Sequence, residues 1–286
     1  MSLCLQFVLK DVYSPIKQMK NVGIDYVTSL LASGRYTVTR EEASKTLSRK
    51  GSAVDKIFQR LRRSGWVLPI GDSFFTIIDP SNRSNKSLPP SWFVDAWSRH
   101  KGVEYYVGGL TAAEVYGAAH QRSQSFQMVV NRPLRPFRLP MQKVTFLYRQ
   151  RLDGSMWRLF KAPTGNYRVS TPEITAYDLL SLRKACPSLD HAATVYVELG
   201  EAMRAQRLAK LAVMGLETAT LQRMGWLLDH TGWSHLTGTL ECKLRAHSPK
   251  WVPLQSGADR HGTKDAKWMI IENAGIQPDI EPQRTV

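Results

Sequence analysis

The first eighty residues alternate between short helical patterns and glycine stops. A first helix is predicted by apolar residues at helical spacing: Val22, Tyr26, Val27, Leu30 and Leu31. Thr39 and Glu42 form a capping box, which predicts the start of a second helix. Ser52 and Asp55 stand in the same three-residue relation. We therefore expect Ser52 to cap a third helix that ends at Gly65.

Two apolar runs follow the third helix. WVLPI and FFTII are separated by the turn GDS and predict a hairpin of two strands. Three short helices followed by a hairpin are the layout of a winged helix-turn-helix, which we predict as a DNA-binding domain over residues 1–80. The hairpin tip, Gly71-Asp72-Ser73, is then expected near the DNA backbone. Trp66, Phe74 and Phe75 suit base stacking or core packing, and packing is the favoured interpretation.

The patterns change after residue 80. DPSNRSNKSLPP has no periodicity, so residues 81–90 are predicted to be a linker. Short helices then mix with strands such as FQMVVN and KVTFLYRQ. STPEITAYDLLSLRKA, capped by Thr171, opens a mainly helical part, and KWMIIEN predicts a last strand. The predicted fold class is α+β, with an N-terminal winged helix-turn-helix, a mixed α+β middle region and a mainly helical C-terminal region. Residues 91–286 form one α+β domain or two subdomains, 91–170 and 171–286.

The predicted third helix has two unlike sides on a helical wheel. Its apolar side consists of Val54, Ile57, Phe58 and Leu61. The opposite side and its flanks carry the predicted DNA-binding residues Ser52, Lys56, Gln59, Arg60 and Arg63. Cations, amides and hydroxyls are the groups that contact phosphates and base edges in the major groove. A solvated charged face is the alternative, but the helix is the third in a three-helix unit, which favours DNA.

The charge of the chain also points to a polyanion. The formal net charge is +15, and a surplus of this size is typical of nucleic-acid binding. Arg40 at the start of the second helix, and Lys45 and Lys50 around the following turn, are predicted phosphate contacts that set register.

A second basic surface is predicted in the middle of the chain. Residues 81–150 carry 10 Lys and Arg against 3 Asp and Glu, a net of +7. The proline-stiffened loop RPLRPFRLP places Arg132, Arg135 and Arg138 three residues apart. These guanidinium groups suit a nucleic-acid backbone or an acidic partner, and a merely solubilising hairpin loop explains them equally well.

Motifs for catalysis are missing. The chain has no HExxH, GxSxG or Walker sequence, and its carboxylates do not cluster. The pair Gly108-Gly109 precedes a predicted helix, as in an anion-binding turn, but the further glycines and the lysine are absent. Asp229, His230, His235 and Cys242 lack metal-ligand spacing. We therefore expect no enzyme activity, no cofactor and no metal.

The three cysteines, Cys4, Cys186 and Cys242, lie far apart and favour a reducing cytoplasm. No apolar run approaches the ~20 residues of a membrane span. The start MSLCLQFVLKDVY is a poor signal peptide; it is an ordered arm, a frayed end, or an extension upstream of a true start at Met19.

Several segments, taken in order, resemble the AbiEi family of antitoxins. They are RLRRSGWV, YYVGGLTAAEVYGAAHQ, VSTPEITAYDLL, LQRMGWLLDHTGWSHLTGTL and KWMIIEN, and the resemblance covers about residues 25–275. AbiEi proteins are the antitoxin halves of type IV toxin–antitoxin and abortive-infection (phage defence) systems. The resemblance implies a repressor that binds inverted-repeat operator DNA, with two copies on the DNA. It also implies a C-terminal domain that neutralises a nucleotidyltransferase-like toxin, without implying a direct complex.

Two other functions compete with this interpretation. A ligand-responsive winged-helix transcription regulator, unrelated to a toxin, has the same N-terminal layout. A nuclease with a winged-helix targeting domain is disfavoured by the missing carboxylate cluster.

Overall fold

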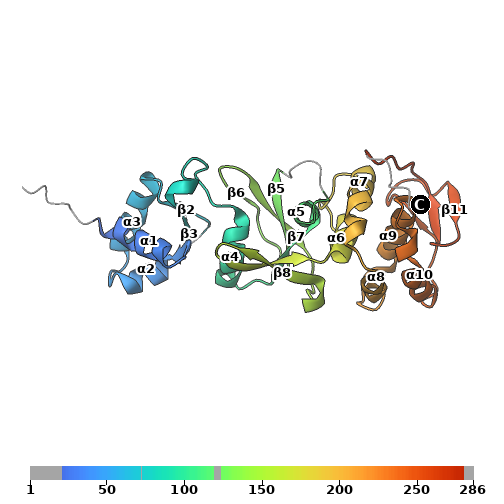
Figure 1. The fold of residues 1–286 in the computed structure, drawn as a ribbon, viewed down its shortest axis with the longest axis horizontal. Helices are drawn as coiled ribbons and strands as arrows, with labels where there is room; N and C mark the ends of the chain where they lie inside the picture. The colour runs from blue at the N-terminus through green and yellow to red at the C-terminus, as the bar shows by residue number, and fades with distance from the viewer. Residues whose placement is uncertain (1–20, 72, 119–123, 280–286) are drawn as a thin grey trace, which may run out of the picture.

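The structure is a computed structural model that describes residues 21–71, 73–118 and 124–279. The expectations for residues 1–20, and for Asp72 in the hairpin tip, lie outside the described residues. Figure 1 shows an elongated molecule in which helices α1–α3, a central sheet and a group of helices follow one another along the long axis. The predicted α+β fold class is confirmed.

The N-terminal unit, residues 21–78, contains three helices and three strands. Its elements are α1 (Val22–Ala32), β1 (Thr37–Thr39), α2 (Arg40–Thr46), α3 (Ser52–Arg63), β2 (Val67–Pro69) and β3 (Phe74–Ile77). The strands form an antiparallel sheet in the order β1-β3-β2. The first core, which includes Val27, Leu61 and Ile77, lies between the helices and this sheet.

Local signals set most of these boundaries. The capping box is present: the Glu42 N–H donates to the Thr39 hydroxyl at 3.1 Å. Gly65, with φ of 73°, follows the end of α3. The prediction that Ser52 caps α3 is wrong. Gly51, with φ of 56°, is the cap residue, and Ser52 is already the first helical residue. Glycine holds this left-handed turn, so no side-chain oxygen caps the helix.

A mixed sheet forms the middle of the molecule. Its elements are η1 (Pro80–Asn82), η2 (Pro90–Trp92), α4 (Val94–Lys101), β4 (Tyr105–Val107), α5 (Gly109–Val115), β5 (Ser125–Val130), β6 (Phe137–Arg138), β7 (Lys143–Tyr148), η3 (Gly154–Met156), β8 (Trp157–Ala162) and β9 (Gly165–Ser170). The strand order is β6-β7-β5-β4-β9-β8. β5 pairs with β7, and β4 with β9, in parallel; the other pairs are antiparallel.

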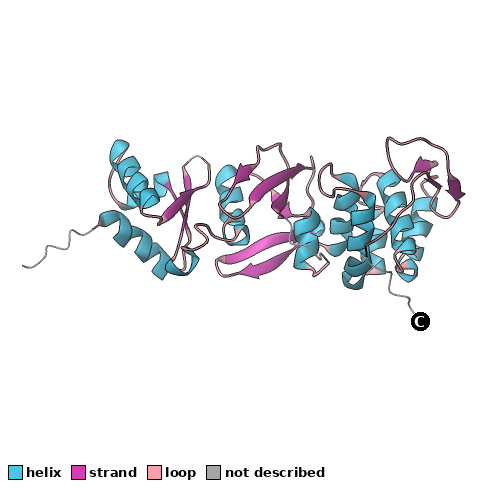
Figure 2. Cartoon of the chain, turned by 90° about the horizontal axis from the view of Figure 1, so that it is seen from above, coloured by secondary structure: helices cyan, strands magenta, loops and turns pink. Residues whose placement is uncertain are grey.

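Both faces of this sheet are covered. Side chains alternate along a strand, so Val107, Met128 and Val130 enter the second core, with α4, while Tyr106 and Val129 enter the third core, with the C-terminal helices. Figure 2 shows the sheet between the N-terminal unit and those helices. The second core also takes Ile70 and Phe74 from the first unit's hairpin.

The C-terminal region begins with helices and ends with a small sheet. Its elements are α6 (Pro172–Ser181), α7 (Leu189–Leu199), η4 (Gly200–Ala202), α8 (Ala205–Leu211), α9 (Thr218–His230), η5 (Ser234–Leu236), α10 (Gly238–Arg245), β10 (Val252–Pro253), β11 (Thr263–Asp265) and β12 (Ile270–Glu272). The last three strands pair in the order β10-β12-β11. In the described part of this region the last helix ends at Arg245 and three short strands follow, so the region as a whole is not mainly helical. The strand predicted at KWMIIEN is β12. None of the described helices is long and apolar enough to cross a membrane.

Candidate nucleic-acid interface

Helix α3 presents an exposed polar side. Val54, Ile57, Phe58 and Leu61 are 1–8% exposed and pack into the first core. Ser52, Lys56, Gln59, Arg60 and Arg63 are all exposed. The amphipathic wheel thus separates the two sides as the sequence predicts. It brings three cations, an amide and a hydroxyl onto one helix surface without a competing ion pair among the described residues.

Helix α2 and the following turn add cations next to α3. Arg40 is partly exposed, and its Nη2 lies 2.5 Å from Asp55 Oδ2 at the start of α3. This exposed ion pair links α2 to α3 and partly neutralises Arg40. Lys45 and Lys50 are exposed and unpaired among the described residues. Their free charges suit phosphate contacts better than that of Arg40 does.

The hairpin aromatic residues pack within the protein. Phe75 stacks on Phe58 with ring centroids 4.1 Å apart. Phe74 is 2% exposed and faces His100 on α4. Trp66 is half-buried, with the Arg83 guanidinium 4.3 Å from its ring centroid. These contacts favour packing over base stacking.

The second basic surface begins beside the hairpin. Arg132, Arg135 and Arg138 are exposed on the segment between β5 and β7. Because β5 and β7 run in parallel, this segment is a crossover and not a hairpin loop. Arg132 Nη2 donates to the Lys101 carbonyl at 2.5 Å. A Cβ on Gly71 would lie 3.8 Å from Lys101 Nζ, so the hairpin tip, Lys101 and Arg132 are neighbours.

Lys101 carries no functional signal in the sequence. It is the last residue of α4 and is followed by Gly102 in a left-handed conformation. In the sequence this pair indicates only the end of a helix. Lys101 becomes a candidate because the fold places it against the tip of a hairpin thirty residues away.

The glycine pair after β4 serves packing. A Cβ on Gly109 would lie 2.2 Å from Gln127 Oε1, and one on Gly108 would lie 2.7 Å from Val129 Cγ2. Gln127 Oε1 also accepts from the Leu110 N–H at 2.6 Å. The first turn of α5 is thus satisfied from inside the protein and is not open to an anion.

The Asp229 region is held together by protein contacts. Lys267 Nζ and Trp268 Nε1 donate to Asp229 Oδ2 at 2.6 and 2.7 Å. His230 stacks on Trp226, with ring centroids 3.6 Å apart. Across the part of the chain that the structure describes, no three His, Cys, Asp or Glu side chains gather as metal ligands.

A buried ion pair joins the middle sheet to α6. Arg149 Nη2 lies 2.5 Å from Asp178 Oδ1 and 3.2 Å from the Ser181 hydroxyl. The Tyr106 hydroxyl donates to Asp178 Oδ2 at 2.9 Å. Burial raises the pKa of Asp178 to about 6, although the Arg149 charge and the Tyr106 hydroxyl oppose this shift. Both carboxylate oxygens of Asp178 are bonded within the fold, whereas Arg149 Nη1 is buried without a hydrogen-bond partner among the described residues. The contacts to Asp178 give the pair a structural role.

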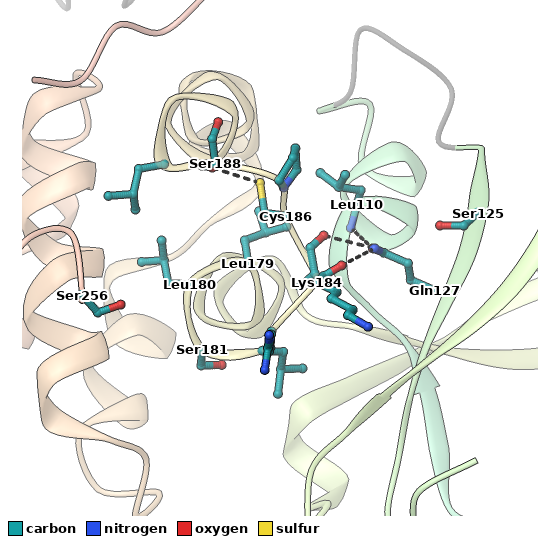
Figure 3. Close-up of a pocket in the computed structure, with 15 residues that line it drawn as sticks. Leu110, Ser125, Gln127, Leu179, Leu180, Ser181, Lys184, Cys186, Ser188 and Ser256 are labelled. Carbon is teal, nitrogen blue, oxygen red and sulfur yellow. Dashed lines mark hydrogen bonds between the residues drawn. The ribbon is translucent and has the colours of Figure 1, made fainter. Parts of the chain in front are cut away.

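A cavity of about 810 Å³ lies between the sheet and the C-terminal helices. Figure 3 shows Gln127 in its wall, donating to the carbonyls of Lys184 and Ala185 at 3.2 and 3.1 Å. The Cys186 thiol donates to the Ser188 carbonyl, with Sγ 3.4 Å from the oxygen. Burial raises the pKa of Cys186 to about 12, so this thiol is not a ready nucleophile.

The middle region and part of the C-terminal region match a known protein family. Residues 106–230 match the family described as the AbiEi antitoxin C-terminal domain. The chain carries an AbiEi antitoxin domain. The resemblance seen in the sequence motifs is thereby confirmed over residues 106–230, while RLRRSGWV and KWMIIEN lie outside the match. The domain runs from β4 to the end of α9, and contains the Arg149–Asp178 pair and the second basic surface.

One solved structure shares the fold over most of its length. It is the crystal structure of the RV2827C protein from Mycobacterium tuberculosis, with a TM-score of 0.63 and 15% sequence identity. The alignment covers 86% of this chain and 89% of that chain. No curated protein matches. At this identity the likeness concerns the fold alone.

Proposed function

We propose that this AbiEi antitoxin is a DNA-binding repressor of its own operon. Residues 21–78 act as a winged helix-turn-helix in which α3 enters the major groove. The single observation that supports this proposal is the exposed ridge of Lys56, Gln59 and Arg63 opposite a fully packed apolar side. Lys45 and Lys50 bind phosphates beside it. Two copies bind an inverted repeat in the operator.

The second basic surface extends this DNA contact. The hairpin tip contributes Gly71 and Ser73 among its described residues, neither of which carries charge, and Lys101 and Arg132 lie beside it. These cations take the place of a basic wing and bind the phosphate backbone next to the groove that α3 enters.

The AbiEi domain counteracts a toxin, as the family name implies, and we propose a nucleotidyltransferase-like enzyme as that toxin. The antitoxin itself has no enzymatic activity and acts in the cytoplasm without a cofactor. A downstream, overlapping nucleotidyltransferase-like reading frame is the expected gene arrangement.

The decisive experiment replaces Lys56 and Arg63 by Ala together. A mobility-shift titration would use DNA from immediately upstream of the reading frame. Each lost base contact weakens binding by roughly 1–3 kcal/mol. The matched control replaces Lys250 and Arg260, an exposed Lys and an exposed Arg of the C-terminal region, by Ala. If the Lys56/Arg63 variant shifts the DNA as the native chain does, α3 is not the recognition helix.

Toxin counteraction is tested separately. The Lys56→Ala/Arg63→Ala variant is expected to restore growth of cells that express the neighbouring nucleotidyltransferase-like protein, because the AbiEi domain is unchanged. Failure of the native chain to restore growth would contradict the antitoxin role toward that protein.

A further inference from the structure

Strand β8 is an open edge of the six-stranded sheet. Among the described strands it pairs with β9 alone, in the register Trp157↔Ser170 to Ala162↔Gly165. The two strands are joined by the two-residue loop Pro163-Thr164, so Ala162 and Gly165 form a hydrogen-bonded pair and such pairs recur at every second residue. The N–H and C=O groups of Trp157, Leu159 and Lys161 therefore point outward. No described residue bonds to these groups.

The side chains of this edge are partly apolar and partly cationic. Leu159 is 62% exposed, and Arg158 and Lys161 are exposed cations. Lysine on an edge strand discourages pairing with another copy of the same edge, because an antiparallel partner would bring like charges together. The same cations attract an extended segment that carries carboxylates.

A pocket opens at the start of β8. It has a volume of about 300 Å³, and its lining includes three exposed cations: Arg158 on β8, and Arg207 and Lys210 on α8. Among the described lining residues Glu173, in the first turn of α6, is the one acid. It is 1% exposed and accepts from the Arg204 N–H at 2.9 Å through Oε1. Three cations against one carboxylate leave the pocket positive.

The two features are adjacent because Arg158 belongs to both. A strand laid along Trp157, Leu159 and Lys161 ends at the pocket, within reach of Arg207 and Lys210. Backbone hydrogen bonds along an edge require a polypeptide, and a nucleic acid lacks the repeating N–H and C=O groups to make them.

We propose that the outer edge of β8 and this pocket form a docking site for an extended, acidic segment of a partner protein. The segment adds to the sheet as a seventh strand beside β8. One of its carboxylates enters the pocket between Arg158, Arg207 and Lys210, where charge-assisted hydrogen bonds hold it. The inference rests on the proposed toxin counteraction only for the identity of the partner.

The test uses the full chain and a fluorescein-labelled peptide of alternating Glu and Val, followed by fluorescence anisotropy. Leu159→Pro removes one outward N–H and leaves the bonds to β9 intact, since proline is tolerated on an open edge. Lys210→Glu reverses one pocket charge. We expect each variant to bind the peptide roughly five- to tenfold more weakly than the native chain does. Lys250→Glu, on an exposed lysine outside the pocket, is the matched control and is expected to bind like the native chain.

Two further peptides distinguish the contribution of backbone hydrogen bonds to binding from that of the carboxylate charges. A peptide with Gln in place of Glu is expected to bind more weakly, and so is one with N-methylated backbone amides. Equal binding of all three peptides, or native binding by the Lys210→Glu variant, overturns the proposal. So does self-association through β8, seen as a dimer in sedimentation that Leu159→Pro abolishes. DNA binding by the same variants is measured in parallel and stays native, which keeps this result distinct from the repressor test.

Discussion

Replacing Arg149 by Met tests what holds the AbiEi sheet against helix α6. The Arg149 side chain is 10% exposed and the Asp178 side chain is fully buried, with 2.5 Å between their charged atoms. Methionine keeps most of the apolar volume of the side chain and removes the charge. Asp178 is then left with Tyr106 as its remaining hydrogen-bond partner among the described residues.

The cost of this change depends on pH. In the native chain burial raises the pKa of Asp178 from an ordinary 3.8 to about 6. The folded state thus holds this proton more tightly than the unfolded state does. The contribution of Asp178 to the stability of the native chain therefore falls as pH rises towards 6 and is then level. Without Arg149 the pKa rises further, so the variant keeps losing stability above pH 6. Each pH unit lowers the unfolding free energy of the variant by about 1.4 kcal/mol, so the two units between pH 6 and pH 8 add roughly 3 kcal/mol to the loss.

Urea unfolding of the full chain, followed by tryptophan fluorescence, measures the effect. We expect Arg149→Met to lower the unfolding free energy by about 1 kcal/mol at pH 5 and by about 4 kcal/mol at pH 8. The control is Arg151→Met, which alters an exposed arginine two residues away and is expected to change stability by less than about 0.5 kcal/mol. A loss of the same size at both pH values would refute the argument, because it would show that packing and not charge is lost.

Three further changes have simple readouts. Gly225→Ala would place a Cβ 2.2 Å from Trp268 Cζ3, so we expect a loss of about 2 kcal/mol or more in thermal or urea unfolding; an unchanged midpoint would contradict the close approach. Thr39→Ala removes the capping hydroxyl of α2 and is expected to cost about 1 kcal/mol in the same assay, whereas Thr39→Ser should recover most of it. Arg132→Ala is expected to reduce the steepness of the plot of log binding constant against log salt concentration for operator DNA by about 1. An identical slope would show that Arg132 does not contact the DNA.

The local parts of the fold could be predicted because their causes are local. The capping box of Thr39 and Glu42 lies within four residues. The separation of Phe58 from Lys56 follows from helical periodicity alone. Ser52 is predicted as the cap because serine and glycine are both common at the N-cap of a helix. The left-handed φ of Gly51 decides between them, and it cannot be seen in the residue letters.

Long-range pairing left no comparable signal. Strands β5 and β7 are each clear in the sequence, but their parallel pairing depends on β6 and the crossover between them. Arg149 and Asp178 lie 29 residues apart, and neither stands out from other charged residues in its own segment. The pocket cations Arg158 and Lys210 are likewise brought together only by the tertiary fold, which places β8 and α8 at the wall of the same pocket.

The hairpin residues Ile70 and Phe74 connect the proposed DNA-binding and antitoxin functions physically. Each is 2% exposed, and both belong to the second core although they precede the linker that the sequence suggests. Tyr36 of the N-terminal unit also contacts Trp92 of the middle region edge to face, with ring centroids 5.2 Å apart. Separation of the two parts would expose these apolar side chains to water, at a cost of about 1.5–3 kcal/mol for a fully buried aromatic. The orientation of α3, the proposed recognition helix, relative to the middle sheet is therefore set partly by these contacts.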